Sequence, residues 1–184
     1  MKFLKPSKGF LGLPKENKSK NKVYIIPFGL EKTVSYSSGT KNGPKKIIEA
    51  SHQVELFDEE LKLESYKKFN IKTLKQEKIK PKLNDSLNQL SKIIEKTLKS
   101  KCFPLTLGGE HSITPAIIKP LAKKYSNLTI VQIDAHADLR DGYMGIHNSH
   151  AAAMRRCLDN KNIKIVSIGI RNLCQEEFNY FKKN

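Results

Sequence analysis

The stretch Leu128-Thr129-Ile130-Val131-Gln132-Ile133-Asp134-Ala135-His136-Ala137-Asp138 decides the fold. Its first six residues are mostly apolar and partly β-branched, which is typical of a buried parallel strand and too short for a helix. Asp134, His136 and Asp138 follow directly after the carboxyl end of this strand. In open α/β sheets that edge is where ligands bind, because loops converge there on a rigid base. The stretch therefore predicts a parallel sheet with a site at its edge.

Residues that could bind a metal follow a second apolar run as well. Residues 102–107 are mostly apolar and lead directly into Gly108-Gly109-Glu110-His111. Four of the five histidines then lie within one stretch of 40 residues, namely His111, His136, His147 and His150. Because folding does not require histidines to cluster, chemistry is the simpler explanation for this stretch.

Carboxylate and imidazole groups at this spacing predict a metal site. Three ionisable groups within five residues would repel and desolvate one another without a cation. Mixed ligands of this kind suit first-row divalent ions, and ligand type alone does not choose among Mn²⁺, Fe²⁺, Co²⁺, Ni²⁺ and Zn²⁺. The structural alternative is that Asp134 and Asp138 cap turns and that His136 packs in the core. The second ligand set, after residues 102–107, favours the metal site.

The rest of the chain alternates strand and helix patterns. Apolar residues at helical spacing predict an amphipathic helix over 85–99 that packs on the sheet. Pro120 is expected to kink or end a helix over 113–124. Further strands are expected at 23–28 and 163–168, weaker strands at 54–57 and 66–73, and further helices at 44–50 and 151–158. This alternation is typical of a three-layer α/β fold with a parallel sheet.

Three motifs that occur in order resemble the ureohydrolase family of arginases and agmatinases. They are Leu107-Gly108-Gly109-Glu110-His111-Ser112-Ile113-Thr114, Asp134-Ala135-His136-Ala137-Asp138-Leu139-Arg140 and Ser149-His150-Ala151. The similarity also includes residues 39–44 and 47–51 and ends near Gly169-Ile170-Arg171, so that it covers roughly residues 22–175. It implies a three-layer αβα arginase-like fold with a parallel sheet. Residues 1–21, which are rich in lysine and broken by proline and glycine, are expected to form a mobile basic arm before a partial ureohydrolase domain at 22–184.

The resemblance implies Mn²⁺-dependent hydrolysis of agmatine to putrescine and urea, a reaction of polyamine biosynthesis, with two ions in the complete site. His111 and Asp138 resemble ligands of one ion, His136 resembles a ligand of the other, and Asp134 resembles a bridging ligand. His150 resembles the family histidine that shuttles protons. Two ions can lower the pKa of bound water from about 16 to about 7, which supplies the hydroxide that a resonance-stabilised guanidinium carbon needs.

Two residues beside these ligands have competing interpretations. His147 could replace His150 as proton donor, but its glycine-containing polar loop is more typical of a residue that faces solvent or substrate. Glu110 is expected either to orient His111 through a hydrogen bond or to begin the following helix.

The chain departs from the family pattern after its last motif. Family members carry a later Ser-x-Asp-x-Asp segment that completes both metal spheres, and a further acidic residue that holds the guanidinium. After Asp159 the only acidic residues here are Glu176 and Glu177. We therefore expect that the carboxyl-terminal portion is missing and that the chain alone is inactive, as a truncated or split agmatinase. The alternative is a non-catalytic remnant that binds a metal or a partner chain.

Composition limits the partners. The formal net charge is +16, but arginine, the preferred residue for bidentate phosphate contacts, occurs only four times among 34 basic residues. No nucleic-acid partner is therefore expected, and the expected ligand is a small cationic guanidino compound. A homo-oligomer or a complementing carboxyl-terminal chain is also possible.

Two further features bear on location. No apolar run reaches the roughly 18 residues of a membrane span, so no membrane partner is expected. The three cysteines are widely spaced and odd in number (Cys102, Cys157 and Cys174), which favours reduced thiols and a cytoplasmic location over a disulfide framework.

Overall fold

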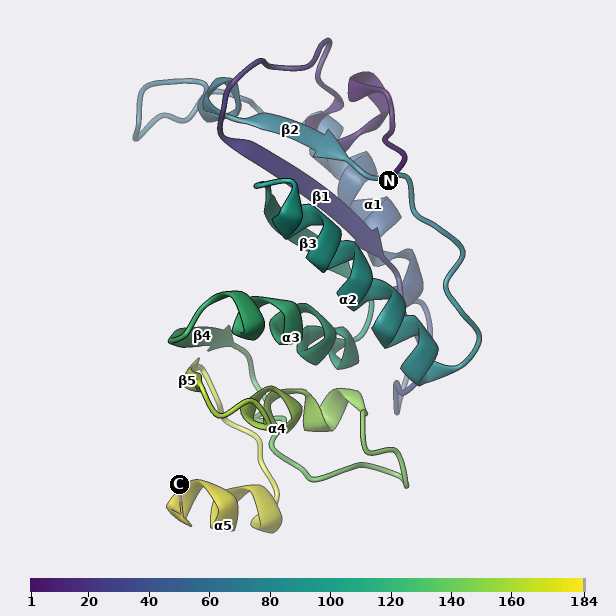
Figure 1. Ribbon diagram of the computed structural model, residues 1–184, viewed down its shortest axis with the longest axis vertical. Coiled ribbons are helices and arrows are strands. Elements are labelled where there is room, and N and C mark those ends of the chain that lie inside the picture. Colours follow the sequence, from purple (N-terminus) through teal and green to yellow (C-terminus); the bar gives the residue numbers. More distant parts are fainter. Residues whose placement is uncertain (184) are drawn as a thin grey trace. The chain divides into compact units, whose positions relative to one another are not determined.

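Five parallel strands form two sheets in the computed structural model, which describes residues 1–183 (Figure 1). The first sheet has the order β2-β1-β3 and consists of β1 (Lys22–Phe28), β2 (Asn70–Thr73) and β3 (Phe103–Gly108). The second sheet pairs β4 (Leu128–Ile133) with β5 (Ile163–Ile168). The expected α/β fold with parallel pairing is confirmed.

The chain divides into two compact units, each with one of these sheets. Unit 1 contains residues 1–31, 38–79 and 92–109, and unit 2 contains residues 32–37, 80–91 and those from 110 onward. The helix α2 (Leu83–Lys99) contributes its residues up to Ser91 to unit 2 and the following ones to unit 1. Leu90 and Ile94 of this helix are completely buried, as its amphipathic pattern predicted.

Unit 1 is organised around β1, its central strand. Ile25, Ile26 and Phe28 of β1 are buried, as expected of a strand paired on both edges. The helix α1 (Gly43–Ala50) has Pro44 in its first turn, where the missing N–H of proline costs nothing. Gly109 follows β3 with no room for a Cβ, which would lie 2.2 Å from the carbonyl oxygen of Leu30.

Residues 1–21 are part of unit 1 and pack against its β1 and β2 strands. They contain two 3₁₀ turns, η1 (Pro6–Lys8) and η2 (Phe10–Gly12). The Phe3 ring meets the Tyr24 ring edge-on at 4.9 Å between centroids, and Leu13 is buried. The mobility expected for this segment in solution remains a prediction, as does the boundary between residues 21 and 22.

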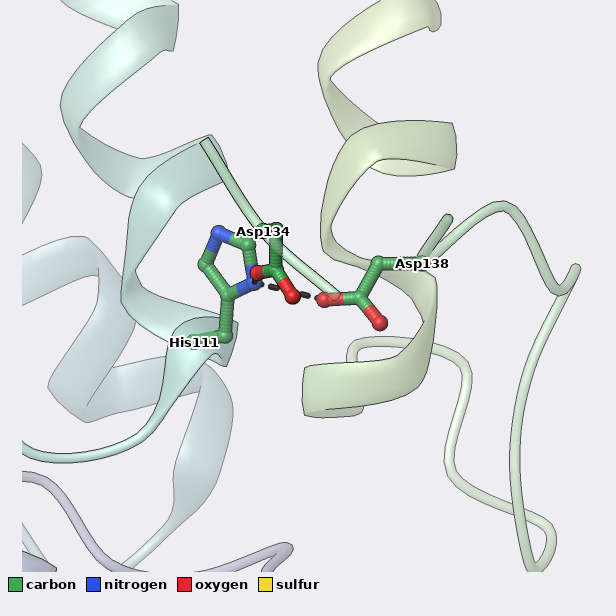
Figure 2. A group of neighbouring side chains, drawn as sticks. All are labelled: His111, Asp134 and Asp138. Atoms are coloured by element: carbon green, nitrogen blue, oxygen red, sulfur yellow. Dashed lines mark hydrogen bonds and ion pairs between the residues drawn. The ribbon is translucent and has the colours of Figure 1, made fainter. Parts of the chain in front are cut away.

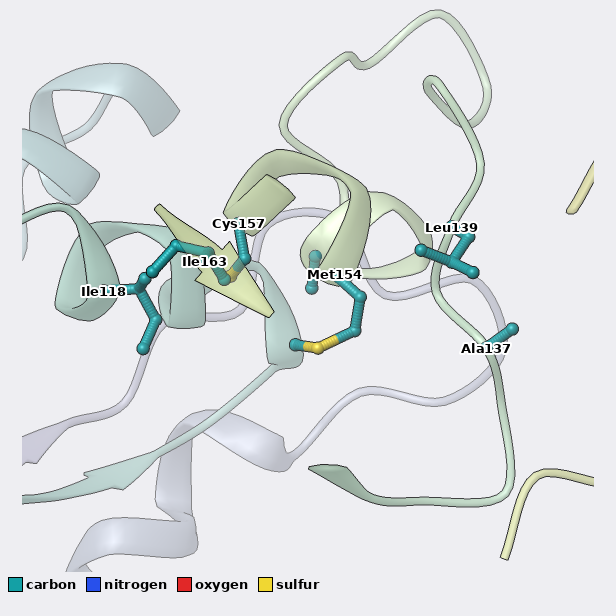
Figure 3. Packing of buried hydrophobic residues seen from close by; sticks show 7 residues of the cluster. Ile118, Ala137, Leu139, Met154, Cys157 and Ile163 are labelled. Carbon is teal, nitrogen blue, oxygen red and sulfur yellow. The ribbon is translucent and has the colours of Figure 1, made fainter. Parts of the chain in front are cut away.

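Unit 2 buries its core between one face of the second sheet and two helices. These are α3 (Thr114–Lys124) and α4 (Ala153–Leu158), and α5 (Gln175–Lys183) follows β5. Figure 3 shows Met154 and Cys157 of α4 in the same cluster as Ile118 of α3 and Ile163 of β5. No helix in residues 1–183 is both long enough and apolar enough to cross a membrane.

Pro120 does not end α3, which was one of the two outcomes expected from the sequence. Proline cannot donate the backbone hydrogen bond that would satisfy the carbonyl of Ala116, four residues earlier. The hydroxyl of Ser91 donates to that carbonyl instead, at 2.6 Å. With its freed acceptor satisfied, the helix continues to Lys124.

Other sequence-based boundaries also need correction. Residues 54–57 form no strand, because the pairing nearby is a single bridge between Asp58 and Leu63. The strand expected at 66–73 is restricted to β2, since the 3₁₀ turn η5 (Ser65–Lys68) precedes it. The strands at 128–133 and 163–168 have the expected bounds, but β4 leaves alternate residues exposed, and β5 leaves Lys164 and its last three residues exposed. The expectation that both would be buried is wrong.

Candidate metal centre

Three of the predicted ligands converge after the carboxyl end of β4. Figure 2 shows the His111 ring facing the carboxyl groups of Asp134 and Asp138. The Nδ1 atom of His111 lies 2.5 Å from Oδ2 of Asp138 and 3.5 Å from Oδ2 of Asp134. One ligand atom from each of these residues lies within 4.8 Å of the others. Asp138 is buried, whereas His111 and Asp134 are partly accessible.

These donor atoms fit a divalent cation. Two carboxylates this close to one another repel unless a positive charge lies between or beside them. Imidazole nitrogen and carboxylate oxygen together suit first-row divalent ions, Mn²⁺ among them. The partial accessibility of His111 and Asp134 leaves a route for an ion and for water.

Asp134 is fixed by the loop that follows the neighbouring strand. Its backbone N–H donates to the carbonyl of Ile168, the last residue of β5, at 3.1 Å. One residue later, the carbonyl of Ala135 accepts the N–H groups of Arg171 (2.9 Å) and Asn172 (3.0 Å). The pairing of β4 with β5 therefore extends past the ends of both strands, and these backbone hydrogen bonds fix the position of Asp134.

Asp138 has a left-handed backbone, with φ 52°, which is unfavourable for a residue with a Cβ. Its carbonyl accepts the N–H groups of Met154 and Arg155 in α4, at 3.0 and 3.1 Å. The next N–H, that of Leu139, donates to the buried carboxylate of Glu177 at 2.9 Å. Bonds on both sides thus hold a conformation that the residue would not adopt alone, as is common at functional sites.

The sequence identified Glu177 only as one of the last two acidic residues, and its role was missed. The carboxylate lies in the first turn of α5 and also accepts the N–H of Cys174, at 2.7 Å. It does not join the metal cluster but ties α5 to the loop after Asp138. An unusually buried glutamate could be recognised only from the structure, because its partner Leu139 lies 38 positions away.

His136 lies apart from the three clustered ligands. Its side chain is 61% exposed, and its Nδ1 lies 3.5 Å from Oδ1 of Asp134. Its backbone N–H donates to the same oxygen at 2.8 Å. The two oxygens of Asp134 therefore face different histidines, Oδ2 towards His111 and Oδ1 towards His136.

Glu110 is a buried carboxylate that binds partners other than His111. Its Oε2 accepts the backbone N–H groups of Lys32 (2.8 Å) and Thr33 (2.7 Å). Its Oε1 accepts the hydroxyls of Thr33 (3.0 Å) and Ser112 (2.6 Å). The prediction that Glu110 orients His111 is wrong. Because the backbone at Glu110 is extended, consecutive side chains point to opposite sides.

Glu110 does stand at the start of the following helical segment, as the residue before η6 (His111–Ile113), the 3₁₀ turn that precedes α3. Its side chain makes no capping bond to that turn. The bonds of Glu110 instead order residues 32 and 33, which lie far away in the sequence.

Thr33 connects this carboxylate to His150, the predicted proton shuttle. The Thr33 hydroxyl oxygen accepts the backbone N–H of His150 at 3.0 Å and lies 3.2 Å from its Nδ1. The His150 ring also meets the Tyr143 ring edge-on, at 5.8 Å between centroids. His150 begins η7 (His150–Ala152), which contacts η6, the turn that begins with His111. Sequence reasoning missed Thr33, which carries no recognisable motif.

His147, the competing histidine, is exposed and lies against the guanidinium of Arg156. Arg156 is buried and also bonds the carboxylate of Asp141 at 2.8 Å. The hydrogen bond from this guanidinium, together with its charge, lowers the pKa of Asp141. His147 therefore belongs to an arginine and carboxylate network and not to the group around His111.

The chain belongs to the arginase family, whose model matches residues 21–184. It is 36% identical over 168 residues to the agmatinase of Bacillus cereus, covering 89% of this chain and 57% of that protein. It is 35% identical over 161 residues to the N(1)-aminopropylagmatine ureohydrolase of Synechocystis, covering 84% and 52% respectively. The solved structure of the agmatine ureohydrolase of Thermoplasma volcanium is similar with a TM-score of 0.76 and 28% identity, over 93% of this chain and 57% of that one.

These similarities confirm the ureohydrolase resemblance and the arginase-like fold. The chain spans about half the length of the curated relatives it matches.

Proposed function

We propose that this chain forms the metal-binding part of a Mn²⁺-dependent ureohydrolase that converts agmatine to putrescine and urea. The observation that carries the proposal is the convergence of His111, Asp134 and Asp138 within 4.8 Å, after a parallel strand of an arginase-family fold. A cytoplasmic place in polyamine biosynthesis would suit this reaction and the reduced cysteines.

His111, Asp134 and Asp138 would hold one ion, and Asp134 with His136 would begin the site of a second. The orientation of the two Asp134 oxygens towards different histidines supports a bridging role for this residue. When bound, such ions supply a water-derived nucleophile at neutral pH and neutralise the surrounding carboxylates.

The reaction requires the addition of water to the guanidinium carbon and cleavage of its bond to the amine nitrogen. The departing amine must gain a proton, and urea and an ammonium product result. We assign this proton transfer to Nε2 of His150, because Thr33 holds the Nδ1 side of the ring. A histidine suits the task because it titrates near neutral pH.

The choice of agmatine rests on two relatives. The names of the Bacillus cereus agmatinase and the Synechocystis N(1)-aminopropylagmatine ureohydrolase both refer to agmatine or a derivative of it, and each protein is about one-third identical to this chain. Other guanidino compounds present the same reacting carbon and differ at the remote end. A substrate panel of agmatine, guanidinobutyrate and arginine would separate them.

The second candidate function is a non-catalytic remnant that binds one metal or a partner chain. It is favoured by the small donor set for a second ion, since His136 is mostly exposed and contacts only Asp134 among the proposed ligands. A remnant would bind Mn²⁺ without releasing urea in any assembly.

Urea release from agmatine distinguishes these candidates. The chain would be extended with the portion of the Bacillus cereus agmatinase that it does not span, and urea would be measured with and without Mn²⁺. We expect Mn²⁺-dependent release that His136→Ala and Asp138→Asn abolish, whereas Glu49→Ala, at an exposed position on α1, retains it. Full activity in either ligand variant would contradict the assigned roles. No release by the extended chain would favour the remnant.

A further inference from the structure

A small hairpin lies between the metal cluster and the predicted proton shuttle in the sequence. In Figure 1 it is part of the loop that leads from β4 to α4. Tyr143 and Ile146 exchange backbone hydrogen bonds at 3.0 and 2.9 Å. Met144 and Gly145 form the tip, with φ of 50° and 75°, and two-residue hairpin turns favour positive φ at both of these positions.

The sequence of the tip does not favour this turn by itself. Left-handed backbone is unfavourable for a residue with a Cβ such as Met144, and asparagine, aspartate and glycine are the residues typical of this position. The Met144 side chain is 78% exposed and therefore gains little from packing. The hairpin thus needs contacts from the rest of unit 2 to keep its shape.

Arg156 of α4 supplies these contacts at the base of the hairpin. Its Nη1 donates to the backbone carbonyl of Asp141 at 3.0 Å, and its Nη2 donates to Oδ1 of the same residue at 2.8 Å. The same guanidinium lies against the ring of His147, which follows the hairpin. One side chain therefore holds the residues on both sides of the turn.

The guanidinium suits this task because it is buried and planar. The Arg156 side chain is only 6% exposed, and a buried cation that lost its partners would be left uncompensated. Its third nitrogen, Nε, lies 3.0 Å from Oδ2 of Asp159, so two carboxylates balance the charge. Lysine has a single ammonium group and cannot reproduce the fixed fork that meets both oxygens of Asp141.

The hairpin in turn places Tyr143 against His150. The two rings meet edge-on at 5.8 Å between centroids, and the guanidinium of Arg140 lies 5.1 Å from the Tyr143 ring. Thr33 holds Nδ1 of His150, but a contact at one ring atom leaves the ring able to pivot about it. An aromatic ring packed edge-on limits that movement.

We propose that Arg156 is a positioning residue for His150, which acts through Asp141 and the hairpin that carries Tyr143. This inference rests on the proposed function, because that function assigns the proton transfer to His150. Without the guanidinium, Tyr143 would move away from the His150 ring. The ring would then spend less time in the orientation that presents Nε2 to the departing amine.

Proton cross-relaxation between the two rings tests the proposal in the 184-residue chain, without an activity assay. The chain would be isotope-labelled in histidine and tyrosine and studied by nuclear magnetic resonance. The signals of His150 and Tyr143 would be identified by their loss in His150→Asn and Tyr143→Leu. We expect a cross-peak between these rings in the unaltered chain and its loss in Arg156→Lys.

Asp141→Ala is a second variant that does not depend on a buried replacement. It removes the carboxylate partner of Arg156 on the hairpin side, at a side chain that is 65% exposed. The cross-peak between Tyr143 and His150 should weaken here as well. If Arg156→Lys does not fold, this variant decides the outcome.

Two controls separate positioning from a general loss of stability. Arg155→Lys makes the same chemical change one position earlier in α4, where the guanidinium lies 3.6 Å from the centre of the Tyr180 ring. Asp159→Asn removes the other carboxylate partner of Arg156 and leaves the hairpin side intact. Both controls should retain the cross-peak.

A kinetic measurement then tests the consequence for the reaction. In the chain extended with the Bacillus cereus portion, Arg156→Lys should lower kcat for urea release by at least about tenfold, since a positioned general acid contributes about 10²–10⁴-fold. Its affinity for Mn²⁺ should not change, because the metal ligands are untouched. Arg155→Lys should retain the kcat of the unaltered protein.

The proposal would be overturned by a cross-peak that persists in Asp141→Ala, or by one that disappears equally in both controls. Urea release that Arg156→Lys does not slow would also contradict it. An extended chain that releases no urea, with the cross-peaks as expected, would contradict the proposed function and leave the placement of His150 by Arg156 standing.

Discussion

Replacement of Glu110 by alanine tests the network that holds His150. In the substituted protein the backbone N–H groups of Lys32 and Thr33 would lose their acceptor, and of these two residues Thr33 is buried whereas Lys32 is exposed. The hydroxyls of Thr33 and Ser112 could turn to other acceptors and the N–H of Lys32 could bind water, but the buried N–H of Thr33 would stay unsatisfied. Since a buried unsatisfied donor costs about 1–3 kcal/mol, Glu110→Ala should lower the free energy of unfolding by about 1–3 kcal/mol.

Glu110→Gln provides a graded comparison. The amide retains one oxygen that can accept both N–H groups, while its NH₂ group can donate to the two hydroxyl oxygens. Only the charge assistance is lost, so the expected decrease is about 1 kcal/mol.

The assay is urea unfolding of the full chain, followed by far-ultraviolet circular dichroism. The control is Glu49→Ala, at an exposed glutamate whose carboxylate pairs with Lys46 at 2.9 Å, which should leave the free energy of unfolding almost unchanged. If Glu110→Ala is no more destabilising than this control, or if glutamine is worse than alanine, the network does not stabilise the fold as argued.

Three further outcomes are expected from the packing and charges of unit 2. Met154→Ala should lower the free energy of unfolding by about 2–5 kcal/mol, because Met154 is buried in the core cluster. The control Met144→Ala, at an exposed position, should change it by less than about 0.5 kcal/mol. Both values would be measured by urea unfolding. Burial, and to a smaller extent the nearby carboxylate of Asp159, raises the pKa of the Cys157 thiol to about 12. Iodoacetamide should therefore modify Cys157 at least about a hundredfold more slowly than the half-buried Cys174. Mass spectrometry would follow both reactions. The hydrogen bond from the Arg156 guanidinium lowers the pKa of Asp141. The Asp141 carboxylate therefore contributes to stability above the ordinary aspartate range, and this contribution is lost as the pH falls through the lowered pKa. In urea unfolding, Asp141→Asn should be less stable than the unaltered chain near neutral pH and equally stable in acid.

Local sequence patterns predicted much of the fold. The strands at 128–133 and 163–168 have the expected bounds because β-branched apolar runs of this length have few alternatives. The motifs also predicted that His111, Asp134 and Asp138 form one group, although β3 and β4, the strands that precede them, belong to different sheets.

The parts that could not be predicted depend on contacts between distant residues. The bonds of Glu110 to Thr33 join positions 77 apart, and those of Thr33 to His150 join positions 117 apart. No periodicity or motif signals such pairs. The continuation of the helix past Pro120 could not be predicted for a similar reason, because the hydroxyl that compensates for this proline comes from Ser91 of another helix.

The exposed face of β4 and β5 shows a different limit. An apolar run indicates that both sides of a strand are suited to burial, but it does not say which polypeptide covers each side. Val131 and Ile133 have the pattern of core residues and are nevertheless exposed in this chain.

Titration of the chain with Mn²⁺ tests the central claim most directly, namely that His111, Asp134 and Asp138 form a metal site. Free and bound Mn²⁺ would be measured by electron paramagnetic resonance for the unaltered chain and for Asp138→Asn, which keeps the shape of the side chain and removes its charge. We expect saturable binding to the unaltered chain and a loss of affinity of at least about tenfold in the variant. Equal affinities would contradict the assignment of this cluster as the metal centre.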